Sequence, residues 1–350
     1  MNYARYLTGF TVGLLFYVHI GTAVLAAVPA DAPKDIKHIL GLYYGNGENI
    51  LIRENLGRLE LLYRFAQTDK SFAGANIYPL KKVHFDSYTL NESGPMSATE
   101  TNVRFERDTD GYGISCRVGG HTYSRYFLGT TTGERAKPFR LPLKSSDDWS
   151  KLKDEAEKSV MPPALAVGKQ AVLVDASVVA GMRIDSVYAK SDNLFSAPLY
   201  STTKLYLAEP VAEALKKVQQ ALATYGYGLV LWDAYRPWYV SKLANLALPE
   251  DKKTLLSDPD KEGSVHNTGT AVDVGLYKID TGEQLELGCD FDEPSFRQFS
   301  SYSGGTSRER YLRNLLREVM ELNGFRSIEM EWWHFEYASD TKWAHLNTKF

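Results

Sequence analysis

The pattern of hydrophobic residues changes character at one charged stretch, and this change divides the chain into two units. The stretch lies between Lys144 and Pro163, has the composition of a helix and ends in Met161-Pro162-Pro163. A charged helical segment bounded by prolines is typical of a semi-rigid connector. The chain, at 350 residues, also exceeds the usual length of one domain. We therefore predict a first unit over 31–143, a linker over 144–163 and a second unit over 164–350.

Short alternating hydrophobic runs separated by turn residues fill the first unit. The runs Leu42-Tyr43-Tyr44 and Ile50-Leu51-Ile52 flank the turn Gly45-Asn46-Gly47. Similar runs continue over 59–63 and around Gly119-Gly120. Such runs around Asn-Gly and Gly-Gly turns are typical of consecutive β-hairpins. We predict a small all-β sandwich or barrel, an accessory domain whose function the sequence does not reveal.

The second unit mixes helices and strands. Apolar residues recur at spacings of three and four over 209–225 and again over 310–323, which predicts two amphipathic helices. The apolar run 228–232 predicts a buried strand, and the aromatic-rich segment 331–337 predicts the last strand. Helices packed on a central, mainly antiparallel sheet would make this unit an α+β domain.

The first thirty residues have the features of a signal peptide. Arg5 precedes an apolar run over 6–27, and small residues at 26–30 form a cleavage-like exit. A run of about 20 apolar residues could also remain as a membrane anchor. The alanine-rich exit favours cleavage, so we expect an exported protein, periplasmic or secreted, without a stable membrane span. Cys116 and Cys289 are the only cysteines and fall in different units; we expect two free thiols rather than an interdomain disulfide.

The charge pattern argues against a nucleic-acid partner. Forty Lys and Arg residues and 43 Asp and Glu residues are spread along the chain without long runs. A nucleic-acid-binding protein would be expected to carry a basic stripe. We therefore expect a small substrate and no nucleic-acid partner.

Two short segments of the second unit carry the residue types of a metal site. The first runs from Ser264 to Asp273 and contains His266, and the second is Glu331-Trp332-Trp333-His334. A carboxylate within the apolar run 271–274 is costly unless it is paired or bound to a metal. Each histidine alone could be an ordinary core residue. Together, two imidazoles and one carboxylate predict a zinc ion, one per active site, with its fourth position open for water.

Glu331 and Arg236 could supply the remaining catalytic groups. A Glu side chain reaches one methylene farther than Asp, so Glu331 could take a proton from the zinc-bound water without binding the metal. The alternative interpretation of Glu331 is an ordinary surface glutamate that precedes a strand. Arg236 follows the buried strand, where a fixed guanidinium could stabilise an oxyanion. Its alternative role is a structural ion pair with Asp233. The set predicts a metallopeptidase.

These segments resemble the signatures of the zinc D-alanyl-D-alanine dipeptidases, the family that includes the vancomycin-resistance dipeptidase. The resemblance lies in Ser264-x-His266-x-x-Gly269-x-Ala271-x-Asp273 and in Glu331-Trp-Trp-His334. Further similar motifs occur at similar spacings over 188–195, 226–237 and 280–283. The resemblance covers roughly 175–337, which is almost the whole second unit.

The resemblance implies a role for each candidate residue. The zinc ligands would be His266, Asp273 and His334, with Glu331 as general base and acid and Arg236 as the oxyanion-stabilising group. It also implies that Asp292 holds the substrate ammonium, that Ser264 holds the substrate carboxylate and that Tyr188 contacts the substrate. Two charged anchors at a fixed separation would select a dipeptide. The segment 293–300 departs from the family, which often has an acidic residue and a histidine pair there, so we expect a different pocket rim.

The implied function is zinc-dependent hydrolysis of D-Ala-D-Ala to D-alanine, in cell-wall peptide turnover or recycling. One alternative is a zinc D,D-carboxypeptidase or endopeptidase on longer peptidoglycan stem peptides, with the β unit holding the substrate. An alternative of another class is a non-catalytic cell-wall-binding protein that has kept the fold. A site closed beyond the ammonium anchor would favour the dipeptidase, and a site open on both sides would favour the longer substrates.

Overall fold

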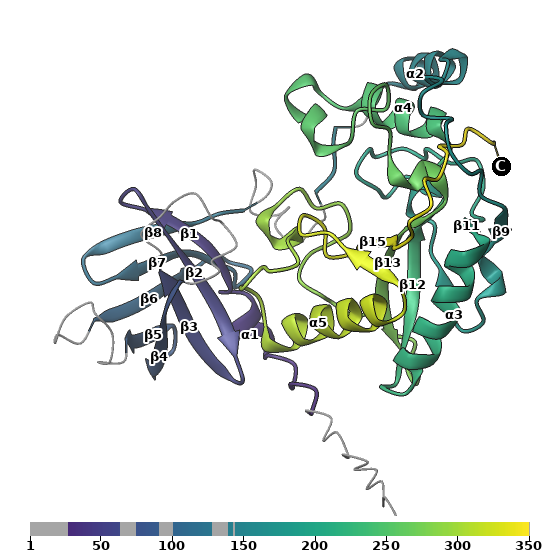
Figure 1. Ribbon diagram of the computed structural model, residues 1–350. Coiled ribbons are helices and arrows are strands. Elements are labelled where there is room, and N and C mark those ends of the chain that lie inside the picture. The colour runs from purple at the N-terminus through teal and green to yellow at the C-terminus, as the bar shows by residue number, and fades with distance from the viewer. Residues whose placement is uncertain (1–26, 64–74, 91–100, 128–138, 143, 350) are drawn as a thin grey trace, which may run out of the picture.

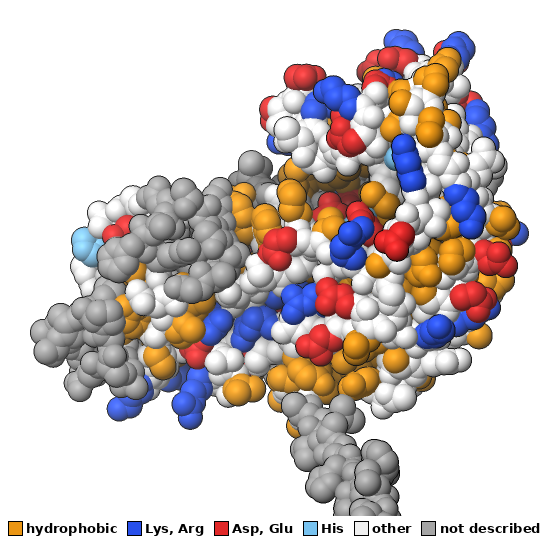
Figure 2. All heavy atoms as spheres, viewed as in Figure 1, with side chains coloured by type: hydrophobic (Ala, Val, Ile, Leu, Met, Phe, Trp, Pro, Cys, Tyr) orange, Lys and Arg blue, Asp and Glu red, His pale blue; other side chains and the backbone are white. Residues whose placement is uncertain are grey.

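The computed structural model describes residues 27–63, 75–90, 101–127, 139–142 and 144–349 (Figure 1). The signal-peptide prediction over 1–30 lies almost entirely outside these ranges. Within them, no helix combines the length and the apolar character needed to cross a membrane. On the face shown in Figure 2, Lys and Arg side chains lie interspersed with Asp and Glu side chains over the second unit.

The first unit is a closed antiparallel barrel of eight strands, so of the two predicted all-β forms the barrel is correct. Each strand pairs with the next, and β8 closes the barrel by pairing with β1. A short helix, α1 (Lys34–Lys37), precedes the barrel. The strands are β1 (Gly41–Gly45), β2 (Glu48–Asn55), β3 (Arg58–Tyr63), β4 (Asn76–His84), β5 (Ser87–Leu90), β6 (Asn102–Arg107), β7 (Gly113–Val118) and β8 (His121–Arg125).

The first hairpin of the barrel follows directly from its turn residues. Gly45 pairs with Glu48, which leaves Asn46 and Gly47 as a two-residue loop. Both have positive φ, 53° for Asn46 and 73° for Gly47. This is the backbone of a type I′ turn, whose twist matches that of the flanking strands, and Asn-Gly is its preferred sequence.

Side chains of the barrel strands alternate between two apolar clusters. Ile50 and Ile52 on β2 belong to the cluster that fills the barrel interior. Leu51 lies between them, is fully buried and belongs to a separate cluster with Tyr302 of the second unit. Since successive side chains of a strand point to opposite faces, Leu51 lies on the outer face of the barrel. The second unit therefore covers part of that outer face.

Residues within the predicted linker form helix α2 (Ser146–Lys158). Ser145 caps its N-terminus, because the Ser145 hydroxyl accepts a hydrogen bond from the Asp148 N–H. The helix packs against α4 (Trp238–Ala247) at the upper end of the second unit (Figure 1). Its Ala156 is buried in the core of that unit. This helix is therefore a packed part of the second unit.

The second unit has a five-stranded sheet in the order β10-β12-β13-β15-β14. Only β10 runs parallel to its neighbour, so the predicted α+β fold with a mainly antiparallel sheet is confirmed. The strands are β10 (Arg183–Ile184), β12 (Tyr227–Asp233), β13 (Ala271–Lys278), β14 (Phe325–Ser327) and β15 (His334–Tyr337), and β9 (Leu173–Asp175) pairs with β11 (Tyr206–Ala208) in a second sheet.

Two amphipathic helices cover the sheet. The helices are α3 (Glu209–Ala223) and α5 (Ser307–Leu322), both predicted from their apolar spacing. Figure 1 shows α5 between the barrel and the sheet, and α3 on the side of the sheet away from the barrel. Short 3-10 helices complete the unit: η2 (Ala176–Val178), η3 (Val187–Ala189), η4 (Glu250–Leu255), η5 (Val265–Thr268) and η6 (Phe296–Gln298).

Candidate active site

The centre of the candidate site is a row of side chains that crosses three strands. Asp233 on β12 pairs with Asp273 on β13, and Asp273 pairs with His334 on β15. Residues directly opposite each other on neighbouring strands project to the same face of a sheet. A register shift between Leu231 and Asp233 accompanies this alignment at the end of β12. The sheet therefore places two carboxylates and one imidazole on one face.

His266 joins this row from η5 and completes a group of three potential metal ligands. Its Nε2 lies 3.3 Å from Asp273 Oδ2 and 3.2 Å from His334 Nδ1. His334 Nδ1 lies 3.0 Å from Asp273 Oδ1. All three side chains are buried. Among the described residues, these three form the group whose ligand atoms are close enough to hold one metal ion.

The hydrogen bonds around His266 orient its ring. Its Nδ1 lies 2.7 Å from the Ala234 carbonyl oxygen, so this nitrogen carries the proton and Nε2 is left as the ligand atom. The Ser264 hydroxyl accepts from the His266 N–H at 3.3 Å, and Gly269 ends the turn with a φ of 76°. The side-chain amide of Asn267 donates to the Arg236 carbonyl oxygen at 2.8 Å. The loop that carries His266 is thus tied to the end of β12.

Glu331 reaches the same group because the chain bends before the last strand. The predicted strand over 331–337 begins only at His334, and the His334 N–H donates to the Glu331 carbonyl oxygen across the bend. This bend brings Glu331 Oε2 to 4.0 Å from His334 Nδ1. Burial among protein atoms, and the nearby charge of Asp273, raise the pKa of Glu331 above its ordinary value. Its side chain is still 34% exposed, so a substrate or water can reach it.

A buried ion pair holds Arg236. Its Nε and Nη2 donate to Asp233 Oδ2 at 3.0 and 2.6 Å, and the Tyr200 hydroxyl donates to Asp233 Oδ1 at 2.5 Å. The guanidinium carbon lies 5.0 Å from the centre of the Tyr188 ring. The structural alternative considered for Arg236 is therefore present. The ion pair with Asp233 fixes the guanidinium beside the three potential metal ligands, so it is compatible with a catalytic role for Arg236.

Asp292 and Tyr188, two of the three predicted substrate-binding residues, are in direct contact. The Tyr188 hydroxyl donates to Asp292 Oδ2 at 2.7 Å. Asp292 has a φ of 60°, an uncommon backbone conformation for a residue with a side chain. Burial, together with the nearby charges of Asp273 and Glu331, raises the pKa of Asp292 to about 8. The third residue, Ser264, lies in the His266 loop and caps η5.

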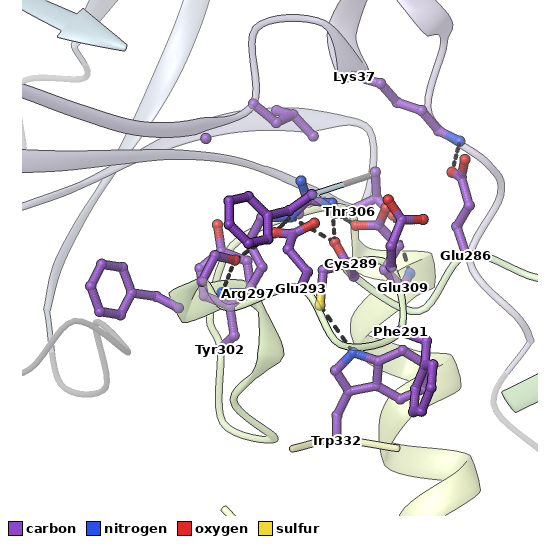
Figure 3. Close-up of a pocket in the computed structure, with 18 of the residues that line it drawn as sticks. Lys37, Glu286, Cys289, Phe291, Glu293, Arg297, Tyr302, Thr306, Glu309 and Trp332 are labelled. Atoms are coloured by element: carbon purple, nitrogen blue, oxygen red, sulfur yellow. Dashed lines mark hydrogen bonds and ion pairs between the residues drawn. The ribbon is translucent and has the colours of Figure 1, made fainter. Parts of the chain in front are cut away.

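An aromatic wall stands beside Asp292. Phe291 has its ring centre 5.9 Å from that of Tyr188, 5.3 Å from that of Trp232 and 5.5 Å from that of Trp333. Trp332 continues the wall at 5.9 Å from Trp232. Phe291 and Trp332 also line a cavity of about 1000 Å³ that lies between the barrel and the second unit (Figure 3). The three potential metal ligands do not line this cavity.

Sequence reasoning missed Tyr200 as a site residue. Its hydroxyl reaches Asp233 from a stretch without helical or strand periodicity, so no pattern marked it. Glu336, whose Oε1 lies 3.9 Å from His334 Nε2, was also missed. It stands two residues after His334 on the same strand, and that spacing is the signal that could have found it. Cys116 and Cys289 are both free, as expected.

Comparisons with known proteins point to one family. The Peptidase M15 family model, described as D-Ala-D-Ala dipeptidase, matches residues 169–350. The D-alanyl-D-alanine dipeptidase of Enterococcus faecium is 34% identical over 175 residues, which cover 45% of this chain and 87% of that protein. That of Escherichia coli K12 is 30% identical over 179 residues, 51% of this chain and 91% of that protein. That of Streptomyces coelicolor is 30% identical over 190 residues, 49% of this chain and 93% of that protein. The barrel precedes the residues that the family model matches.

Proposed function

Because the chain belongs to the Peptidase M15 family of D-Ala-D-Ala dipeptidases, we propose that it hydrolyses D-Ala-D-Ala to D-alanine, with one zinc ion held by His266, Asp273 and His334. The observation that carries the proposal is that the ligand atoms of the three side chains all lie within 4.8 Å of one another, with His334 Nδ1 3.2 Å from His266 Nε2 and 3.0 Å from Asp273 Oδ1. Donor atoms about 2.0–2.1 Å from a tetrahedral zinc ion lie roughly 3.3 Å from one another. Two nitrogens and one carboxylate oxygen are also a donor set that suits zinc.

Bound there, zinc would act as a Lewis acid and lower the pKa of a water molecule. Glu331 would accept a proton at its carboxylate and return it to the nitrogen of the leaving D-alanine. In the metal-free protein, burial raises the pKa of Glu331 above its ordinary value, which brings it closer to the neutral pH at which the carboxyl group must gain and lose a proton. Arg236, fixed by Asp233, would donate to the carbonyl oxygen of the scissile bond as that oxygen gains negative charge.

The contacts of Asp292 support a short substrate. Its carboxylate, held by Tyr188, would bind the substrate ammonium, and Ser264 would bind the substrate carboxylate. Phe291, the residue before Asp292, packs on Tyr188, Trp232 and Trp333. A peptide extended beyond its ammonium group would meet this wall. This arrangement favours the dipeptide over longer stem peptides.

A hydrolysis panel tests the proposal. Zinc-loaded protein is given D-Ala-D-Ala, L-Ala-D-Ala, D-Ala-D-Ser and a pentapeptide that ends in D-Ala-D-Ala. We expect rapid cleavage of D-Ala-D-Ala and no release of D-alanine from the pentapeptide. Glu331→Ala should lose activity and keep its zinc, whereas Glu318→Ala, a substitution at an exposed glutamate of α5, should keep both. Cleavage of the pentapeptide alone would refute the dipeptidase and favour a carboxypeptidase.

A purified protein that holds no zinc and cleaves none of the four peptides would support the non-catalytic alternative. Loss of zinc together with activity in Glu331→Ala would make this residue structural, because a base that does not bind the metal is not needed to retain it.

We propose that the protein acts after export and recovers D-alanine from dipeptide released during cell-wall turnover. The support is the sequence alone: Arg5, the apolar run over 6–27 and the small residues that follow it. Fractionation of cells and N-terminal sequencing of the mature protein test this. A cytoplasmic protein that begins at Met1 would contradict it.

A further inference from the structure

The barrel is joined to the second unit through a carboxylate at a helix N-terminus. Glu54, at the end of β2, is 3% exposed. It accepts hydrogen bonds from the Ser307 N–H at 2.8 Å and from the Ser307 hydroxyl at 3.0 Å, at the first residue of α5. Its own N–H donates to the Gly305 carbonyl oxygen, and Arg310 donates to its carbonyl oxygen at 2.9 Å. The first turn of a helix has unpaired N–H groups and favours a negative charge, so this contact fixes the barrel against α5.

Apolar side chains surround this polar contact. Leu42, Leu51 and Leu62 form a cluster on the outer face of the barrel with Tyr302, and Phe296 and Phe299 pack against it. Leu51 is fully buried and Leu62 is 1% exposed. Such burial is typical of a stable domain interface, because apolar side chains on a free barrel surface would be exposed to water.

The aromatic residues of the second unit at this interface are Phe296, Phe299 and Tyr302. They belong to residues 295–302, here named the docking loop. The Trp332 N–H donates to the Gln298 carbonyl oxygen at 2.8 Å, and the Ser300 N–H donates to the Glu329 carbonyl oxygen at 2.9 Å. These two bonds hold the segment that contains Glu331 on both sides of that residue. The docking loop therefore lies directly behind the proposed base.

The docking loop also holds the segment that carries Asp292. Arg297 donates from Nε to the Gly288 carbonyl oxygen at 2.9 Å. Arg313 on α5 donates to the carbonyl oxygens of Leu287 and Tyr302, at 2.5 and 2.6 Å. Figure 3 shows Arg297 and Tyr302 close together, with Cys289 between them and the pair formed by Phe291 and Trp332. The start of the Asp292 segment, at Leu287 and Gly288, is thus bonded to Arg297 of the docking loop and to Arg313, and its other end continues directly into that loop.

We propose that the barrel is a positioning domain for the active site: its outer face holds the docking loop, and through that loop it fixes Asp292 and Glu331 in place. The proposal rests on the proposed function. It also accounts for the departure of 293–300 from the family pattern, because Phe296 and Phe299 lie there and pack against the cluster that the barrel leucines form with Tyr302. The dipeptide affinity should depend on Asp292, and the turnover rate should depend on Glu331.

A matched pair of substitutions tests the proposal in the full-length, zinc-loaded protein. Leu51→Ala removes a buried leucine from the interface, whereas Leu61→Ala removes a buried leucine from the barrel interior. We expect Leu51→Ala to raise KM for D-Ala-D-Ala by about 3- to 10-fold, with unchanged zinc content, and to speed hydrogen exchange of the amides over 286–302. Leu61→Ala should lower the melting temperature of the barrel and leave KM and this exchange within about twofold of wild type.

Glu54→Gln provides a second variant if Leu51→Ala fails to fold. We expect this variant also to speed hydrogen exchange of the amides over 286–302. A glutamine side chain has one acceptor oxygen where the carboxylate has two, so it pairs less well with the Ser307 N–H and hydroxyl donors. A folded Leu51→Ala or Glu54→Gln protein with wild-type exchange and wild-type KM would overturn the proposal. If the wild-type protein does not cleave D-Ala-D-Ala, the proposed function fails, while the exchange measurement still decides whether the barrel holds the loop.

Discussion

The buried pair of Asp233 and Arg236 allows a quantitative prediction. Asp233→Asn keeps the shape of the side chain and removes its charge. Asp233 is fully buried and Arg236 is 7% exposed, so the guanidinium would lose its partner without gaining access to water. Breaking a buried ion pair at one partner costs about 3–5 kcal/mol. For a domain of about 150–250 residues, 1 kcal/mol shifts the melting temperature by about 2–4 °C, so we expect a decrease of roughly 10 °C.

Asp192→Asn is the matched control. Asp192 also pairs with an arginine, Arg140, at 2.9 Å, but its side chain is 81% exposed. An exposed pair contributes about 0–1 kcal/mol, so this variant should melt within about 4 °C of wild type. Thermal and urea unfolding of both variants measure the difference. A loss below about 1 kcal/mol for Asp233→Asn would refute the view that this pair is a desolvated, strongly coupled unit. We also expect Asp233→Asn to lower kcat at least about 10-fold, because Arg236 is no longer held in one orientation.

Three further predictions follow from the site. Removal of metal by a chelator should abolish hydrolysis, and zinc should restore it in wild type but not in His334→Ala, as followed by activity and metal analysis. In the metal-free protein, the ionised carboxylate of Asp292 is disfavoured in the folded state, because burial raises its pKa. The wild-type protein should therefore lose stability relative to Asp292→Asn as the pH rises from about 4 to 8. A constant difference in stability across that range would contradict the pKa shift. Burial also raises the pKa of Cys116 and Cys289, so both thiols should resist alkylation at pH 8 until the protein unfolds, as measured by mass spectrometry.

The zinc-ligand candidates could be predicted because their sequence context is local. Asp273 is a single carboxylate in an apolar strand, and His266 precedes the Gly269 that ends its turn. Each feature has a cost or a conformational demand that a short window of sequence displays. The helices α3 and α5 were predictable for the same reason, since the spacing of apolar residues depends only on the helix itself.

Features that depend on distant partners could not be predicted. The segment 331–333 is aromatic-rich and reads as a strand, yet it bends because its backbone bonds with the docking loop. Helix α2 reads as a charged connector, because its contact with the core is made by few apolar side chains such as Ala156. Phe296 and Phe299 look like a changed pocket rim until the barrel is placed against them.

The contact between Glu54 and Ser307 also has a consequence for synthesis of the chain. The two residues are 253 positions apart in the sequence. At about 5–20 residues per second, the ribosome needs roughly 13–50 s to make the chain between them. The barrel strands are complete long before α5 and the docking loop exist, so the leucines on its outer face have no partner during that interval. A newly made barrel would therefore be open to association with other apolar surfaces until residues 295–322 have been made.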